Sequence, residues 1–197
     1  MSADVEALRA WISNEHADLL TRFEQTVGAH VPLDFWRQPA GSGGASIAWL
    51  VYHATLHADL AVNAVLRGEA TVISRARRRL GVGGYSLAFG LGEAEVPELT
   101  TALDLDALGD YLDTVHAGIQ AWIEAAPGVT FAELEAPADG PGALTRIGVA
   151  EAEAPWLHRM WAGQPASFFL RWEAIGHRLN HLGEMVSVRN RLGLSPF

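Results

Sequence analysis

Apolar residues recur at three- and four-residue spacing in four long stretches of the chain, which are separated by segments containing glycine and proline. This period is typical of amphipathic α-helices, because residues three and four positions apart lie on one helical face. The pattern predicts helices over residues 3–27, 46–67, 104–126 and 167–191. Gly68, Pro127–Gly128 and Gly193 follow three of these helices, and such residues commonly end a helix.

Two long connections join the predicted helices, over residues 68–103 and 127–165. Connections longer than about 15 residues often hold short helices or functional segments, and "EAEAPWLHRMW" at 151–161 is a candidate short helix. No stretch shows the alternating pattern of a strand, and no repeat of fixed period occurs. We therefore expect an all-α fold, a four-helix bundle with two long connections, formed by one domain over 1–197.

The last predicted helix has two distinct faces. Both faces are expected to be occupied. The main apolar stripe consists of Phe168, Trp172, Ile175, Leu179, Leu182 and Val186. A second face carries His177, His181 and Glu184 among apolar residues. On the first helix, His16 lies on the same apolar stripe as Ile12 and Leu19.

Composition and charge narrow the class of protein. Hydrophobic residues make up 49% and charged residues 19%, as in ordinary globular domains. The net charge of −9 argues against nucleic acid or an anionic membrane as the main partner, which favours a small-molecule substrate. The chain has no cysteine, which excludes disulfides, cysteine-based zinc sites and a thiol nucleophile of its own. The N-terminal residues lack the pattern of a signal peptide, so we expect a cytoplasmic protein.

Histidine pairs one helical turn apart occur twice, as "HATLH" at 53–57 and "HRLNH" at 177–181. With eight histidines in the chain, roughly 0.3 such pairs are expected by chance. Burying several imidazoles is unfavourable unless each ring nitrogen finds a partner, and a divalent metal ion is one such partner. The alternative interpretation is a set of core histidines held by ordinary hydrogen bonds.

The sequence resembles the DinB-like superfamily of metal-binding four-helix proteins. The resemblance rests on "WLVYHATLHADLAVNAVLRG" at 49–68 and "HRLNHLGEMVSVRNRLGLSPF" at 177–197. It implies metal ligation by His53, His177 and His181, and it leaves His57 without a ligand counterpart. It also implies a divalent ion, Zn or Ni first and Mn or Fe as alternatives, and often a homodimer. Characterised members are transferases and isomerases that use low-molecular-weight thiols such as mycothiol or bacillithiol.

The remaining candidates surround this predicted site. Glu184 is expected either to orient a histidine tautomer or to act as a general base, and the alternative is a solvated side chain. His57, His16 and Trp49 are expected to line the pocket, with His57 open as a fourth ligand. The alternative is a hydrogen-bonded core histidine for His16 and a plain core residue for Trp49. The functional prediction is a metal-dependent thiol transferase or isomerase. A metal-assisted hydrolase and a noncatalytic metal- or small-molecule-binding protein are the alternatives.

Overall fold

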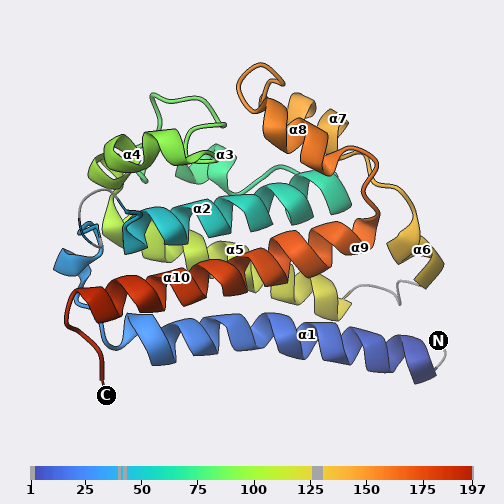
Figure 1. The fold of residues 1–197 in the computed structure, drawn as a ribbon. Helices are drawn as coiled ribbons and strands as arrows, with labels where there is room; N and C mark the ends of the chain where they lie inside the picture. The colour runs from blue at the N-terminus through green and yellow to red at the C-terminus, as the bar shows by residue number, and fades with distance from the viewer. Residues whose placement is uncertain (1–2, 40, 42–43, 126–130, 197) are drawn as a thin grey trace.

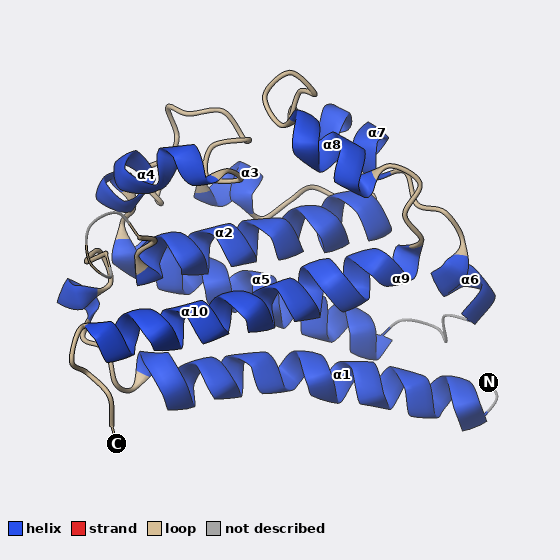
Figure 2. Cartoon of the chain, in the orientation of Figure 1, coloured by secondary structure: helices blue, strands red, loops and turns tan. Residues whose placement is uncertain are grey.

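The structure, a computed structural model, describes residues 3–39, 41, 44–125 and 131–196. Helices account for all of its regular secondary structure, as Figure 2 shows. Within these ranges no β-strand occurs, and strand-like pairing is limited to two isolated bridges, Pro39 with Ser46 and Pro137 with Pro165. The expectation of an all-α fold is therefore confirmed.

Four long helical elements form the body of the fold and lie side by side (Figure 1). They are α1 (Ala3–Phe23), α2 (Ile47–Asp59), α5 (Leu105–Ala125) and α10 (His177–Arg191). Three of them are extended by π-helical turns, η1 (Glu24–Gly28), η3 (Leu60–Leu66) and η5 (Phe169–Gly176). The helices therefore fall where the apolar period places them, to within a few residues. Gly68 adopts φ +65°, a left-handed conformation that favours glycine, just after η3 and Arg67.

Short helices occupy the connections. They are η2 (Leu33–Phe35), α3 (Ile73–Ala76), η4 (Glu93–Glu95), α4 (Val96–Ala102), α6 (Phe131–Glu135), α7 (Gly140–Arg146), α8 (Pro155–Trp161) and α9 (Ala166–Phe168). The short helix expected over 151–161 is α8, which begins at Pro155. The helix stop expected at Pro127–Gly128 lies outside the described residues. No helix in the described ranges combines the length and the apolar character needed to cross a membrane.

The helix α2 is buried on every side. In Figure 1 the segments α3, α4, α7 and α8 run along its outer flank, and α5 and α10 lie against its other side. All 13 of its residues are buried, including His53, His57 and Asp59. Asp59 is held by its surroundings, because its carboxylate accepts hydrogen bonds from the backbone N–H groups of Val72 and Ile73. Buried polar groups need such partners, and these bonds fasten the first connection to α2.

The main apolar stripe of the last helix is not its most buried face. Trp172 is 37% exposed. The buried positions of η5 and α10 are instead Phe169, Leu170, Glu173, Ala174, Arg178, Met185, Val188 and Arg189. The physical reason is twofold. The π-helical turns of η5 change the register of the helix, and the charged side chains are buried because they find partners on other helices.

Candidate metal centre

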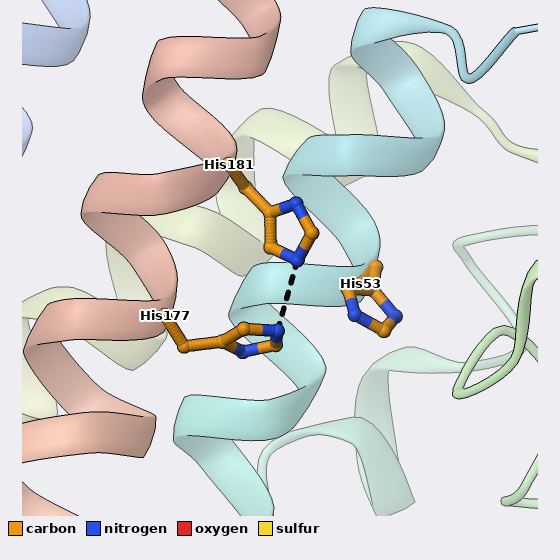
Figure 3. A group of neighbouring side chains, drawn as sticks. All are labelled: His53, His177 and His181. Carbon is orange, nitrogen blue, oxygen red and sulfur yellow. Dashed lines mark hydrogen bonds between the residues drawn. The ribbon is translucent and has the colours of Figure 1, made fainter.

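Three histidines from two helices gather at one point. His53 comes from α2, and His177 and His181 come from consecutive turns of α10, as Figure 3 shows. Each offers one ligand atom, and these atoms all lie within 4.8 Å of one another. The Nε2 atoms of His177 and His181 are 2.9 Å apart. The structure therefore brings together the three residues proposed as ligands from the sequence.

The start of α2 sets the position of His53. Ser46 caps this helix, because its Oγ accepts a hydrogen bond of 3.1 Å from the backbone N–H of Trp49. One turn later, the Trp49 ring stacks on the His53 ring with centroids 4.5 Å apart and an interplanar angle of 16°. Trp49, predicted as a pocket residue, therefore forms a wall directly against a candidate ligand.

Two of the three candidate ligands have their Nδ1 atoms near oxygen. His53 Nδ1 lies 2.9 Å from the Gly90 carbonyl oxygen, and His181 Nδ1 lies 3.3 Å from Glu184 Oε2. A carbonyl only accepts hydrogen bonds, so His53 carries its proton on Nδ1 and keeps the Nε2 lone pair free. A carboxylate imposes the same tautomer on His181. Both rings therefore have an Nε2 suited to bind a metal.

Glycine is required where the Gly90 carbonyl meets His53. Gly90 has φ +91°, in the left-handed region, and a Cβ added there would lie 2.6 Å from Cε1 of Tyr52. Any larger residue would force the backbone away from α2. The loop between α3 and α4 thus contributes one carbonyl oxygen to the orientation of the candidate centre.

The site favours neutral imidazoles. Burial, followed by the proximity of His57, lowers the pKa of His53 to about 2. Burial is also the main cause that lowers the pKa values of His177 and His181 below their ordinary value. A metal-binding histidine must be unprotonated, so the three rings are held in the form that binds metal.

A buried carboxylate lies behind the three histidines, and sequence reasoning missed it. Glu173 is fully buried; its Oε2 lies 2.9 Å from His57 Nδ1 and 3.8 Å from His177 Nδ1. Its Oε1 accepts a 2.6 Å hydrogen bond from Trp161 Nε1. The available sequence signal was spacing, because Glu173 precedes His177 by one helical turn and extends the "HRLNH" pattern backwards.

The residues present fit a divalent ion in two overlapping groups that share His177. One group is His53, His177 and His181, and the other is His57, Glu173 and His177. In the second group, His57 and Glu173 already hydrogen-bond to each other, which occupies a ligand atom on each. The three-histidine group supplies nitrogen donors that suit Zn²⁺ or Ni²⁺, and the Nδ1 atoms of two of its rings, His53 and His181, face oxygen. We therefore favour the three-histidine group, with Glu173 and His57 as supporting neighbours.

Three atoms in this region are buried and lack a hydrogen-bond partner among the described residues, Trp49 Nε1, His57 Nε2 and His177 Nδ1. The His57 ring centroid is 4.6 Å from that of His53 and 4.5 Å from that of His177. His57 thus lies against the candidate ligands, in the predicted pocket region. An unsatisfied buried nitrogen is unfavourable, so a group that enters the site gains by contacting it.

A cleft of about 700 Å³ lies beside the candidate centre, on the side of α4. None of the three histidines lines it, but Trp49, which stacks on His53, and Glu184, which contacts His181, do. The Glu184 side chain is 56% exposed. It therefore contacts both solvent and His181.

His16 lies elsewhere: its ring stacks on His116 with centroids 4.4 Å apart, and its Nδ1 lies 2.8 Å from Gln120 Oε1. The structure does not bring His16 into either candidate group.

The family model of the DinB superfamily matches residues 12–185, a range that includes the three histidines, His57 and Glu173. A search of curated proteins finds no match. The family match covers most of the chain and includes the four long helical elements except the outermost turns of α1 and α10.

Proposed function

The chain belongs to the DinB superfamily, and from that membership we propose that it is a divalent-metal-dependent enzyme. The observation that carries the proposal is the three-histidine group, whose neighbours Trp49 and Glu184 line an adjacent cleft of about 700 Å³. Three ligands leave further coordination positions open, as catalytic metal sites do and closed structural sites do not. A cleft of this volume lies in the range of small-molecule sites.

The proposed reaction is an S-transfer or isomerisation that depends on a low-molecular-weight thiol such as mycothiol or bacillithiol. Because the chain contains no cysteine, a thiol nucleophile has to arrive with a cosubstrate. A bound divalent ion, Zn or Ni first and Mn or Fe as alternatives, favours deprotonation of a coordinated thiol. The family resemblance supports the thiol, and the open cleft supports a second, electrophilic substrate.

The chain's own residues then have separate roles. His53, His177 and His181 hold the ion, and the Gly90 carbonyl orients His53. Glu184 contacts His181 and lines the cleft, so its carboxylate is the group we propose to accept the substrate proton. Trp49 forms an apolar wall beside His53 that positions the substrate and limits access of water. His57 and Glu173 support the centre from the opposite side.

The test is turnover by purified protein reconstituted with Zn²⁺, Ni²⁺, Mn²⁺ or Fe²⁺. A panel of electrophiles is offered with and without a low-molecular-weight thiol, and conjugation or isomerisation is expected only when both metal and thiol are present. His177→Ala should abolish it, while His30→Ala, at an exposed histidine outside the site, should not. Equal turnover without thiol would favour a metal-assisted hydrolase. No turnover with any substrate would favour a noncatalytic metal-binding protein.

A further inference from the structure

A guanidinium group is buried between α1, α5 and α10. Arg178 is 7% exposed, and its Nη1 lies 3.3 Å from His16 Nε2 and 3.4 Å from His116 Nδ1. His16 Nδ1 donates to Gln120 Oε1, which only accepts, so His16 Nε2 is an acceptor for Arg178. The guanidinium is thus held by imidazole rings on two other helices.

These two rings provide no negative charge. Burial, and next the charge of Arg178, lowers the pKa of His16 to about 3 and that of His116 to about 4. Both rings are therefore neutral at physiological pH. An arginine guanidinium stays protonated at that pH, so a full positive charge remains inside the bundle.

No carboxylate in the described part of the chain forms an ion pair with Arg178. The two fully buried carboxylates have other partners, since Asp59 bonds the backbone of α3 and Glu173 bonds His57. A buried charge without a counter-charge is strongly unfavourable. The surroundings of Arg178 therefore favour a bound negative charge.

A small cavity of about 30 Å³ lies beside Arg178, within the bundle. Apart from Arg178 and Thr55 its lining is apolar: Leu19, Leu20, Phe23, Val51, Ala54, Leu112, Leu182 and Met185. The Thr55 hydroxyl is buried and has no hydrogen-bond partner among the described residues. Two independent groups thus line the same space, a cation without a counter-charge and a hydroxyl without a partner.

We propose that this cavity binds one monoatomic anion of the size of chloride, between the Arg178 guanidinium and the Thr55 hydroxyl. A cavity needs about 10–15 Å³ to hold one water, so 30 Å³ accepts one chloride-sized particle. A tetrahedral oxyanion such as sulfate is larger and needs more donors than these two residues supply. Water would satisfy the hydroxyl but would leave the charge of Arg178 uncompensated.

The anion would act as a structural ligand and does not depend on the proposed enzymatic activity. Thr55 belongs to α2 and Arg178 to α10, the two helices that carry the candidate metal ligands. An ion bound between them stabilises the folded state over the unfolded chain by mass action. Stability should therefore rise with chloride concentration and reach saturation.

Two measurements test the site. Crystals of the full chain soaked in sodium bromide should show an anomalous bromide peak in the cavity between Arg178 and Thr55. Thermal unfolding at constant ionic strength should give a saturable increase in Tm with chloride or bromide, and no such increase with gluconate. Absence of the bromide peak together with equal Tm values in all salts would overturn the proposal and would indicate water in the cavity.

Variants separate this site from other halide effects. Thr55→Val removes the hydroxyl at similar side-chain volume and should lose most of the halide-dependent shift in Tm, whereas Thr55→Ser should retain it. Thr21→Val, at an exposed position of α1, is the matched control and should behave as the wild type. If Thr55→Val keeps the full shift, the halide acts at the metal centre or on the surface, and the proposal is wrong.

Discussion

His181 Nε2 lies 2.9 Å from His177 Nε2, one turn away on the same helix. Two neutral ring nitrogens at this distance either share one proton or direct two lone pairs at one electrophile. Since His181 Nδ1 faces Glu184, His181 carries its proton on Nδ1, and the 2.9 Å contact is a hydrogen bond that His177 Nε2 donates to His181 Nε2. A metal ion would take the place of that shared proton, so the pair on α10 would act as a chelate, which His53 from α2 completes.

This arrangement predicts an unequal response to histidine substitutions. His53→Ala, His177→Ala and His181→Ala should each lose bound metal on dialysis and lose the increase in Tm on adding metal, because each removes a ligand. His57→Ala should retain metal, since loss of a supporting residue typically weakens affinity by only about 10–100-fold. Metal content by mass spectrometry and thermal unfolding measure both effects.

Two outcomes would contradict this ligand set. Full metal retention in His177→Ala would show that the pair on α10 is an ordinary hydrogen-bonded pair. Metal loss in His57→Ala equal to the loss in the other variants would show a four-histidine site, which is closed and typical of a structural metal.

Glu173 should matter for both stability and metal affinity. Glu173→Gln keeps the side-chain volume but leaves an amide NH₂ facing either the His57 N–H or the Trp161 N–H. An unsatisfied buried donor costs about 1–3 kcal/mol of unfolding free energy. Metal affinity should also fall by about 10–100-fold, as measured by competition with a chelator. Glu151→Gln, at an exposed position, is the control, and equal behaviour of the two variants would exclude a supporting role for Glu173.

The stability of the fold should depend on the ionisation of His16. Its pKa is about 3 in the folded protein, against an ordinary value of 6.5, so between these pH values only the unfolded chain binds the proton. This contribution is complete above pH 6.5 and is lost as the pH falls towards 3. His16→Gln keeps an acceptor for Arg178 but does not titrate. As the pH falls, the unfolding free energy of this variant should therefore decrease less steeply than that of the wild type, with a difference in slope of up to about 1.4 kcal/mol per pH unit. Denaturant unfolding between pH 7 and 4 measures both slopes; parallel slopes would refute the prediction.

Glu184→Gln separates proton transfer from metal binding. The glutamine Oε1 still accepts from His181 Nδ1, so metal content should stay close to that of the wild type. Turnover should fall by about 10²–10⁴-fold, the usual contribution of a general base. Glu93→Gln alters a second acidic residue in the same cleft and should have a much smaller effect. Equal kcat values for Glu184→Gln and wild type would exclude the proposed base.

We also propose that the protein forms a homodimer through α10. Gly183 is exposed, and a Cβ at that position would meet nothing within 4 Å, so another chain can approach the helix there. Light scattering should give twice the chain mass of 21.2 kDa, and Gly183→Arg should shift the mass towards the monomer. A single mass of 21.2 kDa at micromolar concentration would argue against the dimer.

The long helices and the histidine pairs were predictable because both depend on local spacing. The apolar period located α1, α2, α5 and α10, and the four-residue spacing placed His177 and His181 on one face. Their convergence with His53 was implied by the family resemblance. The structure brings the three together.

Glu173 and Arg178 were not predictable in the same way. A charged residue on a helix is normally taken as solvent-exposed, and its burial depends on partners that are distant in sequence. Glu173 is buried because His57, 116 positions earlier, and Trp161 satisfy its two oxygens. Arg178 meets His16, 162 positions earlier, in the folded bundle. Such pairs cannot be inferred from local periodicity.

The π-helical turns of η5 determine how this region responds to insertions and deletions. A π-turn bonds residue i to i+5, so it accommodates one more residue than an α-turn does. Deleting one residue from Phe169–Gly176 would convert a π-turn into an α-turn, and the residues on its two sides would keep nearly the same relative orientation. The same deletion within the α-helical part of α10 has no π-turn to absorb it and would rotate the following residues by about 100°. A one-residue change in length is therefore compatible with the histidine site before His177 but not between His177 and His181.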